Sequence, residues 1–144
     1  MTVEEIYALP VNQYGWRVLP TGNYVKLGDG VRLGEGVKLG AYVRLGEDVT
    51  LGEGVKLGAG VTLGDDSKTF TWSPLQIQGS RHLLYVAGPT IIGVGCIRES
   101  ASWWRENYRA IGLKEFYTAD QVEEYKAWLD IAIAWQAKLP KVSA

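Results

Sequence analysis

Residues 27–68 read LGDGVR, LGEGVK, LGAYVR, LGEDVT, LGEGVK, LGAGVT and LGDDSK, seven near-identical hexapeptides in succession. Residues 21–26 form a degenerate leading copy. An aliphatic residue followed by Gly every six residues matches neither the 3.6-residue period of an α-helix nor the two-residue period of an ordinary strand. A six-residue period is typical of a parallel β-helix, in which each hexapeptide forms one flat side of a coil.

The repeats also carry a longer period of 18 residues, since Tyr24–Ala41 matches Tyr42–Ala59. Three hexapeptides therefore make one triangular coil, and residues 21–68 predict about 2.7 coils of a left-handed β-helix. We expect Leu at the first position and Val at the fifth to point inward. With about 4.8 Å between stacked strands the prism is only about 13 Å tall. So short a core predicts that the protein needs partners.

The 18-residue register sorts the outward side chains onto three faces. Two faces are acidic, one with Asp29, Glu47 and Asp65 and the other with Glu35 and Glu53. The third face stacks Ala41 and Ala59 with Tyr24 and Tyr42. We expect this third face to pack against another subunit, and a closed homotrimer suits a triangular prism.

The rest of the chain predicts three further segments around the repeat block of residues 21–68, in a mainly β protein. Residues 1–20 read as a short helix, capped by Thr2 and Glu5, and a cover for the first coil. Residues 69–98 read as short strands over 69–72 and 75–78 and a β-hairpin of residues 83–86 and 91–97. Residues 99–144 read as two α-helices, capped near Ser100 or Ser102 and at Thr118.

Composition narrows the functional classes. The net charge of −1 argues against a protein that coats nucleic acid. A single cysteine, Cys96, excludes an internal disulfide and suits a reducing compartment, and its apolar strand predicts a buried small hydrophobe. The sequence has neither a signal-peptide pattern at its N-terminus nor 18 consecutive apolar residues. We therefore expect a cytoplasmic protein without membrane contact.

The repeat block resembles the hexapeptide-repeat superfamily in its order of aliphatic residue, Gly, two variable residues, Val and one variable residue. This resemblance implies a trimer and two kinds of chemistry. Acyltransferases of the superfamily use acyl-CoA with a histidine base, and its γ-type carbonic anhydrases bind zinc through three histidines. The chain has one histidine, His82, so the zinc route is excluded and no metal site is expected. Acyl transfer with His82 as the base stays open.

The remainder, from about Leu75 to Ile133, is similar to small uncharacterised proteins of bacteriophages, which implies a phage setting inside a bacterial host. The similarity rests on these residues: Gly79-Ser80-Arg81-His82, Ile92 to Cys96, Trp104, Glu106-Asn107-Tyr108, Ile111-Gly112, Tyr117-Thr118 and Glu124-Tyr125. It implies no established chemistry, so no catalytic residue follows from it.

The segment from Ser67 to Arg98 carries three Lys or Arg residues, His82 and no Asp or Glu, hence a charge of +3. Cations without counter-charges suit an anionic ligand, above all a phosphate. The predicted ligand-binding residues are Lys68, Arg81, His82 and Arg98, with Trp103 available to stack on a base. In the alternative interpretation, Arg81 and Arg98 pair with acidic side chains of the protein and have a structural role.

Three functional hypotheses follow. The first is a non-enzymatic, homotrimeric phage protein that binds an anionic small molecule between subunits without a cofactor. A cyclic nucleotide or ADP-ribose derivative that signals in bacterial antiviral defence fits this site. The second is an acyltransferase that uses acyl-CoA with His82 as its base. The third is a structural phage protein or an inhibitor of a host protein.

Overall fold

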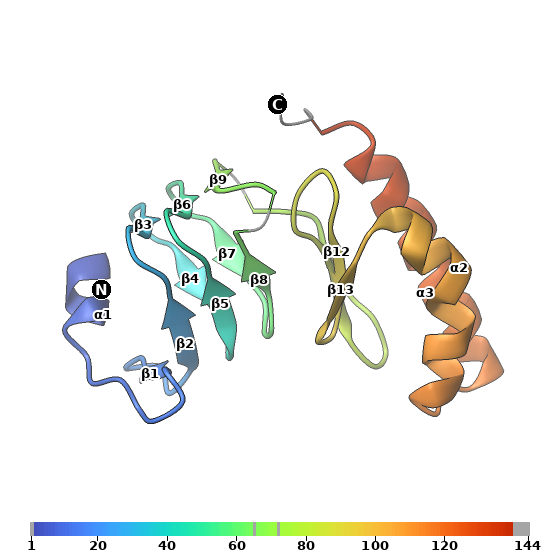
Figure 1. Cartoon of the computed structure of the whole chain (residues 1–144), viewed down its shortest axis with the longest axis horizontal. Coiled ribbons are helices and arrows are strands. Elements are labelled where there is room, and N and C mark those ends of the chain that lie inside the picture. The colour runs from blue at the N-terminus through green and yellow to red at the C-terminus, as the bar shows by residue number, and fades with distance from the viewer. Residues whose placement is uncertain (1, 65, 72, 140–144) are drawn as a thin grey trace. The chain divides into compact units, whose positions relative to one another are not determined.

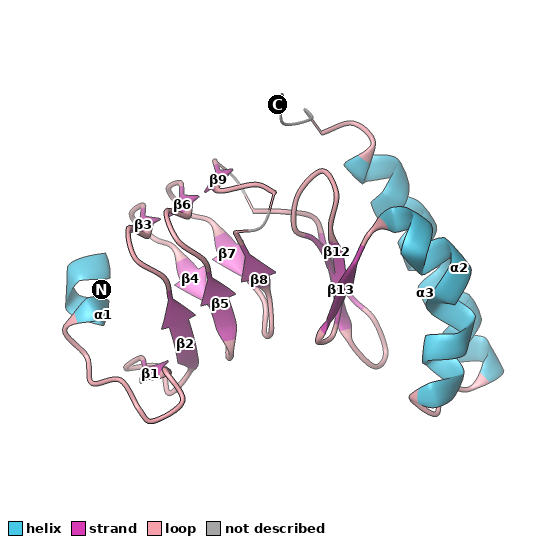
Figure 2. Ribbon diagram, in the orientation of Figure 1, coloured by secondary structure: helices cyan, strands magenta, loops and turns pink. Residues whose placement is uncertain are grey.

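The computed structural model describes residues 2–64, 66–71 and 73–139. The chain forms two compact units, Met1–Pro74 and Leu75–Ala144. Short parallel strands fill the first unit, whereas the second combines a four-stranded antiparallel sheet with two long helices (Figures 1 and 2). Within the described residues, no helix is long and apolar enough to span a membrane.

The hexapeptides form three stacks of parallel strands. The stacks are β2 (Tyr24–Leu27), β5 (Val43–Leu45) and β8 (Thr62–Leu63); β3 (Arg32–Leu33), β6 (Thr50–Leu51) and β9 (Thr69–Phe70); and β4 (Lys38–Leu39) with β7 (Lys56–Leu57). In the first stack Val25 pairs with Val43 and Leu27 with Leu45, a register of 18 residues. The parallel sheets and this register agree with a hexapeptide-repeat β-helix.

Strand β9 lies within the strand predicted over residues 69–72, but its place in the second stack was not expected, because the repeat pattern ends at about Ser67. Thr50 pairs with Thr69 and Leu51 with Phe70, so the register here is 19 residues. The backbone N–H of Thr50 donates to the carbonyl of Lys68 at 2.6 Å. One inserted residue therefore breaks the sequence pattern, yet backbone hydrogen bonds still add a strand to the stack. Asp65 and Trp72, which the sequence predictions included, lie outside the described residues.

Leu and Val side chains fill the interior of the coils, as predicted. Val25, Val43, Val49, Val55 and Val61 have no exposed surface. In the first coil, however, Leu33 and Val37 are only half-buried. Strands β3 and β4 have a neighbouring strand on one side only, so their inward side chains lie beside an open end.

The N-terminal segment covers part of this end. Helix α1 (Val3–Tyr7) has the predicted capping box between Thr2 and Glu5. The hydroxyl of Tyr7 donates to the carbonyl of Gly28 at 2.6 Å and accepts from the N–H of Val31 at 3.2 Å. Strand β1 (Arg17–Val18) pairs antiparallel with β2. The side of the coil that contains β2 is thus covered, whereas β3 and β4 remain open edges.

The sheet of the second unit has four antiparallel strands in chain order: β10 (Gln76–Gln78), β11 (Leu83–Val86), β12 (Ile92–Val94) and β13 (Ile97–Glu99). The predicted hairpin of residues 83–86 and 91–97 is therefore incomplete. A turn at Gly95, where φ is 59°, divides its second arm into two strands. Cys96 lies in this turn and is exposed, so the prediction of a buried cysteine was wrong.

Helices α2 (Ala101–Lys114) and α3 (Ala119–Gln136) begin at N-cap residues Ser100 and Thr118, as predicted. They pack on the sheet face that presents Leu84, Val86 and Ile92, and Trp104 and Leu129 belong to this core. The indole N–H of Trp104 donates to the carbonyl of Ile92 at 2.8 Å. The buried indole thereby satisfies its one donor, because Trp has no other polar atom.

Candidate functional site

Arg81, the first predicted ligand residue, lies in the loop before β11. Its guanidinium sits 4.9 Å from the centroid of the Tyr117 ring. It donates to the carbonyls of Glu115 at 3.0 Å and Phe116 at 3.3 Å. Both carbonyls lie at the C-terminal end of α2, where a cation is favoured by the helix dipole. Arg81 therefore anchors the α2–α3 loop, in a contact that the sequence did not indicate.

His82 is held by two tyrosines. Its Nδ1 forms a short hydrogen bond with the Tyr117 hydroxyl, and the two rings stack with centroids 5.8 Å apart. The Tyr125 hydroxyl donates to the His82 carbonyl at 2.7 Å and accepts from the backbone N–H groups of Arg81 and His82. Burial and the neighbouring Tyr125 raise the pKa of Tyr117, so this phenol stays protonated at neutral pH. Among the described residues, no hydrogen bond reaches Nε2 of His82.

Three segments that lie far apart in the chain meet in this cluster: residues 79–82, Tyr117 and Glu124-Tyr125. A side chain at Gly79 would place its Cβ 2.3 Å from the Tyr125 hydroxyl oxygen, so only glycine fits. The Glu124 carboxylate accepts hydrogen bonds from the hydroxyl and the backbone N–H of Ser80, which lower the pKa of Glu124. The sequence pattern did not indicate Tyr117 and Tyr125 as partners of this loop, because both lie far from it along the chain.

The other predicted residues lie elsewhere. Arg98 is on β13, opposite Gly93 and on the sheet face away from the helices, and burial lowers its pKa. Trp103 packs among the apolar residues under the helices and meets Trp104 edge-on. The sheet therefore separates Arg98 from Trp103. Lys68 belongs to the first unit, and its ammonium donates to the carbonyl of Glu47 at 2.9 Å.

A second group of aromatic and basic side chains, which we call the Trp16 cluster, lies on the first unit. It consists of Trp16, Tyr24, Lys26, Tyr42 and Arg44. The Lys26 ammonium and the Arg44 guanidinium lie 4.8 and 4.9 Å from the centroid of the Trp16 ring. The Tyr42 ring meets Trp16 edge-on at 5.5 Å and stacks on Tyr24 at 5.7 Å. These rings occupy the third face, which the sequence predicted to be aromatic.

Two pairs of cationic side chains flank the corner of the coil at the Trp16 cluster. Lys26 lies beside Arg44 in strands β2 and β5, on one side of this corner. Lys38 lies beside Lys56 in strands β4 and β7, on the other side. The corner between them contains Ala41 beside Gly60, where the other two corners place carboxylates. Anions are therefore favoured at this corner of the coil.

Tyr42 occupies a strained backbone position. Its φ is 62°, at the place in the turn where most of the other hexapeptides have glycine. A left-handed backbone costs a residue with a side chain about 1–2 kcal/mol. Tyr42 nevertheless leaves 55% of its surface exposed. Strained residues of this kind are concentrated at functional sites, which supports a functional role for the Trp16 cluster.

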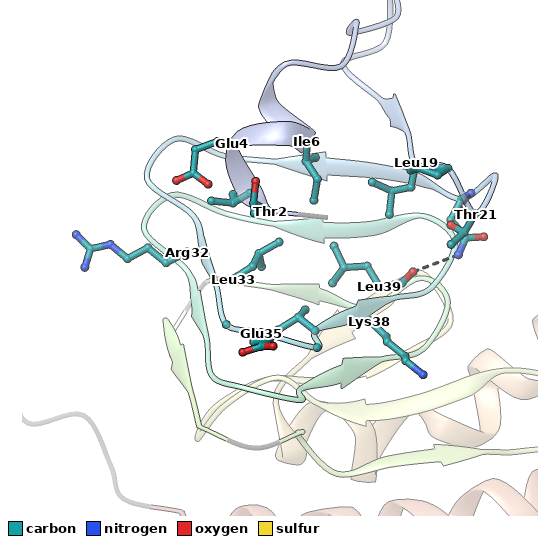
Figure 3. Close-up of a pocket in the computed structure, with 16 residues that line it drawn as sticks. Thr2, Glu4, Ile6, Leu19, Thr21, Arg32, Leu33, Glu35, Lys38 and Leu39 are labelled. Carbon is teal, nitrogen blue, oxygen red and sulfur yellow. Dashed lines mark hydrogen bonds between the residues drawn. The ribbon is translucent and has the colours of Figure 1, made fainter.

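The open end of the first coil contains a pocket of about 1200 Å³ (Figure 3). Its floor is apolar, with Ile6, Leu33, Val37 and Leu39 among the lining residues. Arg32 and Lys38 extend away from it (Figure 3). The described residues contain no group of three or more His, Cys, Asp or Glu side chains that is arranged to hold a metal ion.

Comparison with protein families gives one match. Residues 30–65, a quarter of the chain, match the family described as bacterial transferase hexapeptide (six repeats). No curated protein and no solved structure matches the chain. The match supports the assignment of the repeats to the hexapeptide-repeat superfamily, which is compatible with a transferase-like or a structural role.

Proposed function

We propose that this is a non-enzymatic binding protein whose Trp16 cluster takes an anionic ligand with a flat ring, of the nucleotide class. The observation that carries the proposal is the pair of cations, Lys26 and Arg44, which flank one indole beside two exposed tyrosines. Arginine and lysine bind phosphate, and aromatic rings stack on bases. No cluster member carries a negative charge at neutral pH.

The proposal includes the finer predictions from the sequence. The coil is left-handed with about 2.7 turns, and three copies assemble around the third face, so the ligand lies where subunits meet. Hexapeptide-repeat proteins typically form homotrimers. The biological role is sequestration of a nucleotide signal, such as a cyclic nucleotide or an ADP-ribose derivative, by a phage in its bacterial host. A stable binder without turnover suits this role.

The proposed ligand site differs from the set Lys68, Arg81, His82, Arg98 and Trp103. The reason is the chemistry of Arg81, whose guanidinium already has three hydrogen bonds and a ring contact within the protein. Lys26 and Arg44 contact an aromatic ring, which leaves their N–H donors for a ligand. Among the described residues of the second unit, Nε2 of His82 also has no hydrogen-bond partner.

Thermal unfolding against cyclic nucleotides, ADP-ribose derivatives and acetyl-CoA tests the proposal. A ligand at 100 times its Kd adds about 2.7 kcal/mol of stability, which raises the midpoint. Titration calorimetry of Arg44→Gln and Arg32→Gln then locates the site, because both arginines are exposed and share one repeat position. We expect Arg44→Gln to weaken nucleotide binding at least tenfold and Arg32→Gln to leave it within twofold. Equal effects of the two substitutions contradict the proposed site.

The second candidate function is acyl transfer. The family match, and the hydrogen bond that orients the His82 ring through Tyr117, favour it. It predicts stabilisation by acetyl-CoA and loss of turnover in His82→Ala without loss of folding. A panel in which no ligand raises the midpoint favours the third hypothesis, a structural or inhibitory role.

A further inference from the structure

The turn of residues 40–42, which we call the Ala41 corner, joins two sides of the coil that both carry cations. Lys38 lies on β4 before this corner, and Arg44 lies on β5 after it. Both side chains are exposed, while the residues next to them along each strand are buried or line the interior. Lys38 extends outward from the coil (Figure 3). The two cations therefore project from different sides of the coil and share one corner.

The Ala41 corner differs from the other corners in charge. Alanine occupies the first turn position here in both coils, as Ala41 and Ala59. The equivalent residues of the other two corners are all acidic: Asp29, Glu35, Glu47 and Glu53. Among the described residues, neither Lys38 nor Arg44 forms an ion pair with a carboxylate. An anion at this corner therefore meets cations on both sides and no carboxylate within the turn.

An aromatic ring lies in the corner itself. Tyr42 follows Lys38 by four residues and precedes Arg44 by two, and 55% of its surface is exposed. The N–H of Tyr42 donates to the carbonyl of Tyr24 at 2.6 Å, and the two rings are stacked with an interplanar angle of 7°. A base that stacks on the exposed part of Tyr42 thus has a cation on either side of it.

We propose that the ligand of the Trp16 cluster is a nucleotide with two phosphate groups separated by a nucleoside. One phosphate binds beside Lys26 and Arg44, the other binds to Lys38 on the adjoining side of the coil, and the base stacks on Tyr42. Two phosphates joined directly to each other stay on one side of the corner, whereas a nucleoside between them lets them reach both sides. This inference rests on the proposed function, because it specifies the ligand of the same cluster.

Titration calorimetry with three adenosine nucleotides tests the arrangement of the phosphates. The ligands are AMP, ADP and adenosine 3′,5′-bisphosphate. ADP is the matched control, since it has as many phosphates as the bisphosphate but joins them directly. We expect the bisphosphate to bind about tenfold more tightly than AMP or ADP, because only its second phosphate reaches Lys38 and gains a charge-assisted hydrogen bond there.

Three substitutions then locate the two phosphates. Lys38→Gln should weaken binding of the bisphosphate about tenfold and leave that of AMP within about twofold. Arg44→Gln should weaken both. Arg32→Gln is the matched control, because Arg32 has the same repeat position on β3, which does not border the Ala41 corner. All three residues are exposed, so the variants should unfold at the wild-type temperature without ligand.

The shape of the ligand follows from a linear and a cyclic dinucleotide of adenosine, each with two phosphates. Both contain the proposed arrangement, so at least one should bind as tightly as the bisphosphate and depend on Lys38. The tighter of the two identifies an open or a closed ligand, and failure of both contradicts the proposal.

The outcomes separate this inference from the proposed function. Equal binding of AMP, ADP and the bisphosphate, weakened by Arg44→Gln but not by Lys38→Gln, keeps the nucleotide site and overturns the two-phosphate ligand. Tighter binding of ADP than of the bisphosphate overturns it as well, as do equal effects of Lys38→Gln and Arg32→Gln. If none of these nucleotides binds the wild type, both the inference and the proposed function are wrong.

Discussion

Two glycines in one turn of the first unit should respond very differently to the same added methyl group. Gly34 and Gly36 lie between β3 and β4, above the turn of the next coil. A Cβ at Gly34 would sit 2.6 Å from the backbone nitrogen of Glu53 and 2.7 Å from the carbonyl carbon of Gly52. A Cβ at Gly36 would have no atom closer than 3.9 Å, but the backbone there has a φ of 75°. Gly34→Ala therefore introduces a steric clash with the next coil, whereas Gly36→Ala introduces only backbone strain.

The expected losses of unfolding free energy follow from these contacts. Left-handed strain costs Gly36→Ala about 1 kcal/mol. For Gly34→Ala the two coils must separate, and overpacking of this kind costs about 1–3 kcal/mol. The separation also weakens the hydrogen bond from the N–H of Gly34 to the carbonyl of Leu51, now 2.7 Å long, for about 1 kcal/mol more. We therefore expect Gly34→Ala to lose about 3 kcal/mol.

Urea unfolding followed by circular dichroism and tryptophan fluorescence measures this difference. With a slope of about 1–3 kcal/mol/M, a gap of 2 kcal/mol moves the midpoint by about 1 M. Gly54→Ala is the matched control, since its φ is 73° and no atom lies within 4 Å of the added Cβ, so it should behave like Gly36→Ala. A loss in Gly36→Ala that equals or exceeds that in Gly34→Ala would refute the argument from coil stacking.

Three further predictions concern the second unit. Phe116→Gly should raise the free energy of unfolding of this unit by about 1 kcal/mol, because the Phe116 ring is 88% exposed and glycine relieves the left-handed strain of a φ of 61°. The urea midpoint should rise accordingly, and an unchanged or lower midpoint contradicts this. Thr118→Ala should cost about 1 kcal/mol, since it removes the hydroxyl that caps α3 at the N–H of Gln121, and Thr118→Ser should restore most of it. The hydrogen bonds from Ser80 lower the folded-state pKa of Glu124, so their stabilisation is complete above the ordinary glutamate pKa and disappears as the pH falls through the lowered value. Thermal midpoints between pH 7 and pH 3 should therefore fall less steeply in Glu124→Gln than in the wild type, and parallel curves would exclude this role.

The sequence predicted correctly those structural elements that depend on residues close together in the chain. The capping boxes at Thr2 and Thr118 are visible as pairs of residues three apart, and both caps form. The hairpin prediction was wrong at Gly95. The turn lies inside an apolar run, and the pattern of apolar residues on either side of it continues as in a single strand. The exposure of Cys96 follows from that turn. The strand at Thr69–Phe70 was predicted, but its pairing with β6 was missed, because this pairing depends on backbone hydrogen bonds and not on the repeat sequence.

The candidate sites were harder to predict than the elements. Tyr24 and Tyr42 were predicted to share a face, since the 18-residue period alone places them there. Trp16, which lies outside the repeats, joins them only through the loop that precedes β1. The positive charge of residues 67–98 likewise indicated no single site, because hydrogen bonds to the end of α2 engage Arg81, and the sheet separates Arg98 from Trp103.

The sequence by itself determined the period of the coil, its Leu and Val interior and the aromatic third face, because a repeat of identical local interactions leaves one register that turns the Leu and Val side chains inward. Only the tertiary structure decided which charges have partners and which lie beside rings. It also decided that the first coil ends in an open pocket and that Phe116 stands in solvent. These features depend on which segments meet in space, and no local pattern of residues encodes such long-range contacts.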